Sequence, residues 1–505
     1  MPEPEDSQAE VLAFLRDPAT HGGTAPKEIA THSAIVFLAG DQAMKLKRAV
    51  RYEYLDFSTP GKRRAALDRE LSLNRPAAPM IYRRVATITR QTRGRLGFDG
   101  PGEVVDHVLL MRRFPEGAEL SAIADAGGLD RALATALGAA VARYHANAER
   151  KPEDGAVLIG EIVEELSRAF AGMTQVFGAD EIRRFDAALR TAFEVHAPRL
   201  SARSRAGAVR RCHGDLHLRN LVLIDGRPVP FDALEFDERL GTCDIAYDLA
   251  FLLMDMLHRG LREAATATLT AWLEASADSG ALAPLPLFLS VRAAIRAMVD
   301  VQAMNAGDAD RLKSDARAYL DEAAAFLTPA PPRLIAIGGM SGSGKSTVAR
   351  CLAPEIGAAP GAIQIRSDVE RKAIYGVAAL TPLPRSAYRA EVSARVYARL
   401  FERAEAILVA GHSVILDATF LATEERHAAR AAAARCGVPF RGLWLHADPG
   451  TLESRIGARR DDASDADVTV LRRQLAETTS RPPDWPLVDA TGDPEMVVAR
   501  IREAL

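Results

Sequence analysis

The clearest chemical pattern in the chain is a glycine-rich run, Gly339-Met340-Ser341-Gly342-Ser343-Gly344-Lys345-Ser346, followed by Thr347. Its spacing, G-x-x-x-x-G-K-[ST], stands between an apolar strand at 334–337 and a helix. The glycines let the backbone turn tightly enough for its N–H groups to face phosphate oxygens, and the helix adds its positive N-terminal end. The run therefore predicts a nucleotide phosphate loop, in which Lys345 neutralises the transferring phosphate and Ser346 holds Mg²⁺.

Acidic residues follow two later strands, in Ile365-Arg366-Ser367-Asp368 and in Val414-Ile415-Leu416-Asp417. Around them, from about residue 333 to the end, the sequence resembles the small P-loop kinases that include gluconate kinase, polynucleotide 5′-kinase and zeta-toxin-like enzymes. The resemblance implies that Asp368 accepts the proton of the attacking hydroxyl and that Asp417 holds Mg²⁺ through water. Helix capping is the alternative role for both acids.

Three arginines extend this resemblance. Arg371 is a candidate clamp for an anionic substrate group, because a guanidinium binds oxyanions in a bidentate fork. Arg455 and Arg459 precede a polar stretch through Asp467 that resembles the mobile lid of such kinases, which implies closure over the phosphates. A surface role is the alternative for each arginine.

A second set of residues, His213-Gly214-Asp215-Leu216-His217-Leu218-Arg219-Asn220 with Pro230-Phe231-Asp232, lies in the first half of the chain. It resembles the catalytic loop of aminoglycoside phosphotransferases, choline kinases and their protein-kinase-like relatives, and the likeness extends loosely over residues 34–256. Phosphoryl transfer needs a carboxylate near the acceptor hydroxyl and oxygen ligands for Mg²⁺ nearby. The resemblance implies that Asp215 is the base, that Asn220 and Asp232 are the metal ligands, and that His213 braces the loop.

Such a kinase also needs a strand lysine paired with a helix glutamate to hold the α- and β-phosphates. Lys45 and Lys47 project from one face of the same strand, and Glu70 lies in the next helix. We expect Lys45 to pair with Glu70, and Lys47 remains the alternative. Met111-Arg112-Arg113-Phe114 resembles the segment that joins the two lobes and binds adenine through its backbone. Thr31-His32-Ser33 occupies the turn where protein kinases carry a glycine-rich loop.

The elements that position these residues indicate two different architectures. Strands at 34–38, 43–47, 84–89 and 105–111, a helix at 60–74 and helical stretches further on predict a small β-rich lobe and a larger helical lobe. Strands near 334, 362, 414 and 443 alternate with helices, which is typical of a parallel sheet. We therefore expect an N-terminal bilobal protein-kinase-like fold of the aminoglycoside phosphotransferase type (α+β) and a C-terminal P-loop NTPase fold (α/β).

Closely spaced prolines in Thr328-Pro329-Ala330-Pro331-Pro332 predict the boundary between these parts. The predicted organisation is a kinase-like domain at 1–327, a linker at 328–332 and a P-loop kinase domain at 333–505. The order of the two halves resembles bacterial fusion proteins that join an aminoglycoside-phosphotransferase-like domain to an ATP-binding domain. That resemblance describes ancestry, and fold-level likeness does not select the acceptor.

The bulk composition narrows the class of protein. With 505 residues, more than one domain is expected, and a formal net charge of -3 gives no global attraction for a polyanion. The four cysteines are widely spaced, which argues against a zinc site or a disulfide framework. Residues 1–10 lack the features of a secretory signal, and apolar runs are too short to span a bilayer. We expect a cytoplasmic protein without membrane contacts.

The combined patterns predict two ATP- and Mg²⁺-dependent kinase sites that act on hydroxyl groups of small molecules. One alternative makes the C-terminal half a polynucleotide 5′-hydroxyl kinase, although a basic track with interleaved aromatics is missing. Another makes one half an ATP-sensing regulator of the other. The acceptors, the oligomeric state, coupling between the sites and the choice between ATP and GTP are not encoded in these motifs.

Overall fold

A computed structural model describes residues 8–52, 55–304, 309–460, 462–477 and 485–504 of the chain. Its contacts divide the chain into two compact units. The first unit comprises Met1–Leu158 and Ser201–Asp255, and the second comprises Ile159–Leu200 and Met256–Leu505. The expectation about the N-terminus falls mostly on residues 1–7, outside the described residues. Among the helices described, none combines the length and apolarity needed to cross a membrane.

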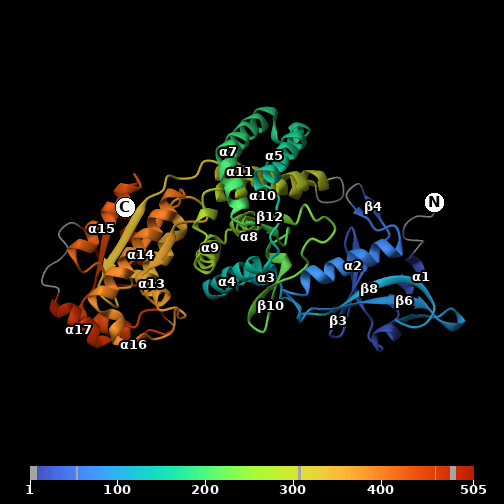
Figure 1. The fold of residues 1–505 in the computed structure, drawn as a ribbon, viewed down its shortest axis with the longest axis horizontal. Coiled ribbons are helices and arrows are strands. Elements are labelled where there is room, and N and C mark those ends of the chain that lie inside the picture. The colour runs from blue at the N-terminus through green and yellow to red at the C-terminus, as the bar shows by residue number, and fades with distance from the viewer. Residues whose placement is uncertain (1–7, 53–54, 305–308, 461, 478–484, 505) are drawn as a thin grey trace. The chain divides into compact units, whose positions relative to one another are not determined.

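The first unit begins with a six-stranded antiparallel sheet in the order β1-β2-β3-β8-β6-β7 (Figure 1). Its strands are β1 (Lys27–Ala30), β2 (Ala34–Ala39), β3 (Gln42–Lys47), β6 (Tyr82–Arg90), β7 (Leu96–Phe98) and β8 (Glu103–Arg112). The four strands expected from the sequence are present, while the edge strands β1 and β7 were not expected. A two-stranded ribbon, β4 (Arg51–Tyr52) and β5 (Leu55–Asp56), follows β3.

Two helices flank this sheet. Helix α1 (Ala9–Arg16) buries apolar side chains against one side of it, Leu15 packing in a cluster with Phe37. Helix α2 (Pro60–Asn74) coincides with the predicted helix. It starts at a Thr59 cap and places Leu67 in a cluster with Tyr82 and Leu109. Glu70, on this helix, is fully buried, which requires charged or hydrogen-bonding partners.

The rest of the first unit holds short strands and helices around the predicted catalytic loop. These elements are α3 (Leu120–Asp125), α4 (Arg131–Asn147), β9 (Val209–Arg211), β10 (Leu221–Ile224), β11 (Arg227–Pro230), β12 (Thr242–Asp244) and α8 (Ile245–His258). Strands β9 and β12 pair with each other, as do β10 and β11. The loop at 213–220 runs between these two ribbons and ends in a short 3₁₀ turn, Leu218–Asn220.

Helices make up the N-terminal part of the second unit. They are α5 (Gly155–Ala171), which begins in the first unit, α6 (Thr174–Phe177), α7 (Ala179–Arg205), α9 (Arg262–Ser276), α10 (Leu285–Ala303) and α11 (Ala309–Phe326). Gly172 and Gly178 separate α5, α6 and α7 from one another. Gly178 has a φ of 81°, which ends a helix readily.

The C-terminal part of the second unit contains a five-stranded parallel sheet in the order β14-β15-β13-β16-β17. Its strands are β13 (Leu334–Gly339), β14 (Ile363–Arg366), β15 (Val414–Asp417), β16 (Phe440–His446) and β17 (Leu487–Asp489). Its helices are α12 (Lys345–Leu352), α13 (Ser367–Ile374), α14 (Ala390–Val409), α15 (Thr423–Arg435), α16 (Pro449–Ala458), α17 (Val468–Glu477) and α18 (Pro494–Ala504). The predicted alternation of strands and helices is confirmed, and the short β17 was not expected.

Helix α9 packs directly against this C-terminal sheet domain. Arg262 Nη1 donates to the carbonyl oxygen of Pro354 at 2.9 Å, and Thr266 Oγ1 donates to that of Pro360 at 2.9 Å. The helix buries residues on all sides, including Trp272. Residues 329–333 form neither helix nor strand, so the boundary at 328–332 remains a prediction, while the compact second unit includes helices from before it.

Candidate functional site

Side chains of helix α8 bind the backbone of the predicted catalytic loop in the first unit. Asp248 accepts hydrogen bonds from the backbone N–H groups of His213 (3.2 Å) and Gly214 (2.9 Å), and Asp255 accepts one from Leu218 (2.9 Å). His213 Nε2 lies 2.9 Å from the carbonyl oxygen of Phe231. Burial lowers the pKa of His213, so the ring is kept neutral in this bracing position. These contacts fix the backbone of the loop.

The loop presents Asp215 and Asn220 together. Asn220 Nδ2 donates to the Asp215 carboxylate and to its carbonyl oxygen, both at 2.9 Å. His217 Nε2 lies 3.4 Å from the same carboxylate, whose side chain is 42% exposed. Asp215 is therefore oriented and reachable by a substrate, and among the described residues the hydrogen bonds of the Asn220 side chain involve its Nδ2 and leave its amide oxygen for a metal.

Lys45 joins Glu70 to Asp232. Its Nζ lies 2.7 Å from Glu70 Oε1 and 2.6 Å from Asp232 Oδ1. Burial opposes the charged ammonium, but the carboxylates of Asp232 and Glu70 raise the pKa of Lys45 well above its usual value. Burial likewise opposes the charged form of Asp232, and Lys45 holds its pKa below the usual value. A positive lysine and the negative carboxylate predicted to bind a metal thus lie in direct contact.

Lys47 makes a different set of contacts. Its Nζ lies 2.7 Å from Glu70 Oε2 and 2.5 Å from Glu235 Oε1, and its side chain is only 1% exposed. The period-two spacing correctly places both lysines on one face, where they share Glu70. Since Lys45 reaches Asp232 while Lys47 is enclosed, the geometry favours Lys45 as the phosphate-binding residue. Glu235 was missed by the sequence reasoning, although it follows Asp232 by three residues.

Asp232 itself has an unusual backbone. Its φ of 61° is rare for a residue with a side chain, and such conformations persist where neighbouring contacts enforce them. The Asp232 N–H donates to the Tyr82 hydroxyl at 3.0 Å, and the Ala233 N–H donates to Asn74 Oδ1 at 2.8 Å. Residues of α2 and β6 therefore aim this carboxylate at Lys45.

In the segment predicted to join the lobes, some backbone N–H groups already donate hydrogen bonds to residues next to sheet strands. The Arg112 N–H donates to Ile81 and the Arg113 N–H to Asp41, both at 2.8 Å. An adenine ring would have to use other backbone groups of residues 111–114. In the turn at 31–33, Thr31 Oγ1 accepts a hydrogen bond from the Ala34 N–H at 3.0 Å. A side-chain hydroxyl therefore stabilises the turn at the place where the sequence comparison expected the glycine-rich loop of protein kinases.

Three buried groups near the loop, His145, Cys212 and Asp248, have ligand atoms within 4.8 Å of one another. Such a set can hold a metal ion. Here both oxygens of Asp248 accept from the loop backbone, and His145 Nε2 lies 3.1 Å from Oδ2. The cluster therefore stabilises the backbone of the loop that carries Asp215.

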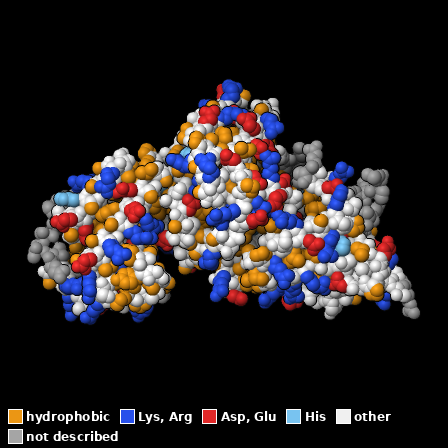
Figure 2. Space-filling model, viewed as in Figure 1, with side chains coloured by type: hydrophobic (Ala, Val, Ile, Leu, Met, Phe, Trp, Pro, Cys, Tyr) orange, Lys and Arg blue, Asp and Glu red, His pale blue; other side chains and the backbone are white. Residues whose placement is uncertain are grey.

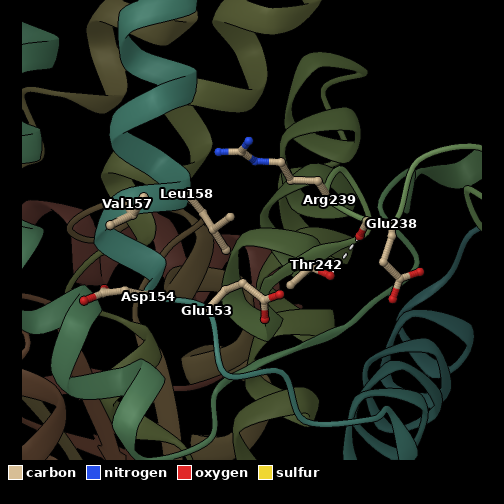
Figure 3. Close-up of a pocket in the computed structure, with 7 residues that line it drawn as sticks. All are labelled: Glu153, Asp154, Val157, Leu158, Glu238, Arg239 and Thr242. Atoms are coloured by element: carbon tan, nitrogen blue, oxygen red, sulfur yellow. Dashed lines mark hydrogen bonds between the residues drawn. The ribbon is translucent and has the colours of Figure 1, made fainter.

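A cavity of about 390 Å³ lies elsewhere in the first unit, at the start of α5 and the segment before β12 (Figure 3). It is lined by Glu153, Asp154, Val157, Leu158, Glu238, Arg239 and Thr242. Glu238 pairs with Lys151 at 3.0 Å and Arg211 at 3.1 Å, and Asp154 accepts from the Ser201 hydroxyl at 2.8 Å. Because these two acids are already paired, they do not form the free anionic cluster that a polycationic sugar requires.

The phosphate loop of the second unit connects β13 to α12, as the motif requires. Gly342 has a φ of 83°, and a Cβ there would lie 2.6 Å from the carbonyl oxygen of Leu452. A Cβ on Gly339 would lie 2.5 Å from that of Leu445. Both positions therefore need glycine. Lys345 Nζ donates to the carbonyl oxygens of Gly339 and Met340 at 2.9 Å, and burial lowers its pKa.

The predicted metal ligands of this unit meet at the ends of β14 and β15. Gln364 Nε2 donates to Asp417 Oδ2 at 3.0 Å and to the Ser346 carbonyl oxygen at 3.4 Å. Arg366 Nε lies 3.4 Å from Asp417 Oδ2. Gln364 and Arg366 were not predicted as site residues from the sequence, although both lie on β14, the strand that directly precedes Asp368. The oxygen donors of Ser346 and Asp417 suit a hard cation such as Mg²⁺.

Asp368 stands in the first turn of α13, close to these groups. Burial raises the pKa of its carboxyl group, and the negative charge of Asp417 adds to this rise. A carboxylate with a raised pKa is a stronger base when ionised, as general base catalysis requires. Position and environment thus suit the predicted role of Asp368.

The three predicted arginines have different surroundings. Arg455 donates to the carbonyl oxygens of Ala490 (2.9 Å) and Gly492 (3.1 Å), and its Nη1 lies 3.8 Å from where a Cβ of Gly344 would be. Burial lowers the pKa of Lys345, and the positive charge of Arg459 contributes to this lowering. Arg371 is buried and donates to the Ala387 carbonyl oxygen at 2.7 Å.

Comparison with known proteins agrees with this division. A model described as "Phosphotransferase enzyme family" matches residues 62–285, and one described as "AAA domain" matches residues 334–481. Uncharacterized proteins of Mycobacterium tuberculosis and Mycobacterium bovis are 29% identical over 483 residues, covering 93% of each chain.

Solved structures resemble the separate parts. A gluconokinase from Sinorhizobium meliloti is 24% identical with a TM-score of 0.25, covering 34% of this chain and 89% of its own. A choline/ethanolamine kinase family protein from Mesorhizobium loti is 14% identical with a TM-score of 0.38, covering 64% of this chain and 99% of its own. By these family models, residues 62–285 match a phosphotransferase enzyme domain and residues 334–481 match an AAA domain.

Proposed function

We propose that the chain carries two kinase sites, each of which transfers the γ-phosphate of ATP to a hydroxyl group of a small molecule. The observation that carries the proposal is that each half gathers a lysine for phosphate, oxygen ligands for Mg²⁺ and a separate carboxylate for the acceptor. In the first half, Lys45 contacts Asp232 at 2.6 Å. In the second, Lys345 lies in the phosphate loop beside Asp417 and Asp368.

In the first half, Lys45 binds the nucleotide phosphates while Glu70 keeps it oriented. Asn220 and Asp232 hold Mg²⁺, which neutralises charge on the phosphates when bound. Asp215, held by Asn220, accepts the proton of the acceptor hydroxyl as the oxygen attacks phosphorus. Lys47 and Glu235 secure the segment that carries Asp232.

In the second half, the backbone of the phosphate loop and Lys345 bind the β- and γ-phosphates. Lys345 exchanges its contacts with the Gly339 and Met340 carbonyl oxygens for phosphate oxygens. Ser346 and Asp417 hold Mg²⁺, and Asp368 accepts the acceptor proton. Arg455 and Arg459 approach the loop from α16 and its end, where positive charge stabilises the transferring group.

The second candidate for the C-terminal half is a polynucleotide 5′-hydroxyl kinase. It is motivated by Asp368 and Arg371, which lie three residues apart on α13 and can bind a hydroxyl and a phosphate together. Basic and acidic side chains are intermingled on the face shown in Figure 2, so this face offers a long nucleic-acid strand no continuous basic track. Transfer of labelled phosphate to an oligonucleotide with a free 5′-hydroxyl separates the two candidates.

A phosphorylation screen over a metabolite panel tests the proposal. Wild type, Asp215→Ala and Lys345→Ala are compared in parallel, because each substitution disables one half. We expect one set of products to be lost with Asp215→Ala and another with Lys345→Ala. Absence of any phosphorylated product with wild type would overturn the proposal. If one substitution left all turnover intact, that half would be the regulator.

A further inference from the structure

The carboxylate of Asp465, in the segment between α16 and α17, is surrounded by donors from another part of the P-loop domain. Lys372 Nζ lies 2.7 Å from Oδ1 and 2.6 Å from Oδ2. The Tyr388 hydroxyl and the Leu383 N–H donate to Oδ2 at 2.5 and 3.1 Å. A buried ammonium, a hydroxyl and a backbone amide thus form an oxyanion site, whose occupant is a side chain of the same protein.

This site has more positive charge than Asp465 alone neutralises. The guanidinium of Arg371 lies 4.7 Å from the ring centre of Tyr388, and Arg371 is only 7% exposed. Its Nε is buried and has no hydrogen-bond partner within the part of the chain that the structure describes. Glu370, which directly precedes Arg371 in sequence, is paired instead with Arg399 at 2.6 Å. Lys372 is thus paired with Asp465, while a second buried cation, Arg371, lies against the Tyr388 ring, so the site can take a further negative charge.

The oxyanion site lies beside the candidate base. Asp368 and Lys372 are four residues apart on α13, which places them on one face of that helix. The segment containing Asp465 also contacts the end of β14, two residues before the base, since Asp462 accepts from Arg366 Nη2 at 2.9 Å. Burial raises the pKa of Asp368, and a hydrogen bond from the side chain of Ser464 acts against that rise. Asp465 thus offers a carboxylate to the oxyanion site, in a segment that also influences the base.

We propose that Lys372, Leu383 N–H and Tyr388, with Arg371 against the Tyr388 ring, are the subsite for an anionic group of the acceptor, and that Asp465 occupies it as an internal stand-in. The acceptor is then a compound that carries a hydroxyl close to a carboxylate or phosphate. This inference rests on the proposed kinase function of the C-terminal half. The internal carboxylate competes for the site. The apparent affinity for an acceptor therefore equals the intrinsic affinity multiplied by the fraction of molecules in which the site is free.

The test is equilibrium binding by calorimetry to the full-length protein. D-Gluconate serves as a hydroxy carboxylate, inorganic phosphate as a phosphate probe and glucose as an uncharged control. We expect Asp465→Asn to bind gluconate or phosphate at least about tenfold more tightly than wild type, with glucose unchanged. The probe whose affinity increases identifies whether the subsite binds a carboxylate or a phosphate. Adding Lys372→Met to Asp465→Asn should remove the gain.

Glu453→Gln is the matched control, because it removes one negative charge from an exposed pair with Arg472 in the same region. It should leave probe binding at the wild-type level. Binding of a Mg²⁺-bound, non-hydrolysable ATP analogue verifies that each variant is folded. If Asp465→Asn binds the analogue normally but gains affinity for neither anion, Asp465 is a structural clasp and the inference is wrong. Since binding is measured without turnover, failure of the kinase assignment would appear separately, as absent product in the metabolite screen.

Discussion

The ammonium of Lys45 lies 2.6 Å from Asp232 Oδ1, although 187 residues separate the two in sequence. Glu70 holds the same ammonium from the other side at 2.7 Å. The sheet thus delivers a cation directly to the carboxylate that the proposal assigns to Mg²⁺. A nucleotide phosphate bound here would meet a positive charge already aligned, so little reorganisation is needed during transfer.

The two neighbouring lysines should respond differently to substitution. Lys45→Met should lower phosphate transfer by the first half by about a hundredfold or more, because it removes the charge next to Asp232. Lys47→Met should destabilise the small lobe by about 3 kcal/mol, because it leaves the buried Glu70 and Glu235 with one fewer cation. Product formation in a Lys345→Ala background and denaturant unfolding measure the two effects. Equal loss of activity and stability in both variants would contradict this division.

Gly342→Ala should abolish tight nucleotide binding by the second half. The new Cβ would lie 2.6 Å from the carbonyl oxygen of Leu452, and the φ of 83° is unfavourable for alanine. The affinity of the loop for an ATP analogue should fall at least about tenfold. Gly411→Ala is the control, since it has a φ of 86° but no atom within 4 Å of the added Cβ. Nucleotide titrations that gave both variants wild-type affinity would refute the predicted loop geometry.

The pH dependence of the second half should reflect Asp368. Because burial raises its pKa, the base becomes protonated at a higher pH than an ordinary aspartate, and kcat/KM should fall earlier as the pH is lowered. Ser464→Ala removes a hydrogen bond that lowers this pKa, so the acidic limb should move further toward neutral pH. Profiles of kcat/KM for wild type and Ser464→Ala measure the shift. A shift in the opposite direction would argue against Asp368 as the base.

Helix α9 should contribute to the stability of the P-loop domain. Thr266→Val removes the hydrogen bond to the Pro360 carbonyl oxygen and should cost about 1–2 kcal/mol in the unfolding of the second unit. Thr270→Val is matched in chemistry but loses only a bond to Thr266 within the helix, so its effect should be smaller. Urea unfolding with and without an ATP analogue provides the measurement. Identical midpoints for Thr266→Val and wild type would show that α9 does not support this domain.

The sequence predicted the elements with strong local patterns. The phosphate loop, the catalytic loop and the strands at β2, β3, β13 and β15 have motifs or apolar runs that depend on a few neighbouring residues. Strand β17 has three residues, and β1 is exposed along its length, so neither leaves a clear apolar pattern. These strands form through pairing with distant segments, which a local pattern does not reveal.

The missed site residues also depend on tertiary contacts. Gln364 and Arg366 belong to no motif, and they matter because β14 pairs with β15 and brings them beside Asp417. Lys47 and Lys45 look equivalent in sequence, and only the positions of Glu235 and Asp232 separate their roles. The packing of α9 on the sheet domain was likewise hidden, because its alanine-rich sequence indicates a helix without naming its partner.

The number of nucleotide sites per chain tests the central claim most directly. Calorimetric titration with a Mg²⁺-bound, non-hydrolysable ATP analogue needs no knowledge of the acceptors. We predict two sites in wild type, one in Lys45→Met, one in Lys345→Ala and none in the double variant. A single site in wild type, or loss of both sites through one of these substitutions, would contradict the account of two kinase sites in one chain.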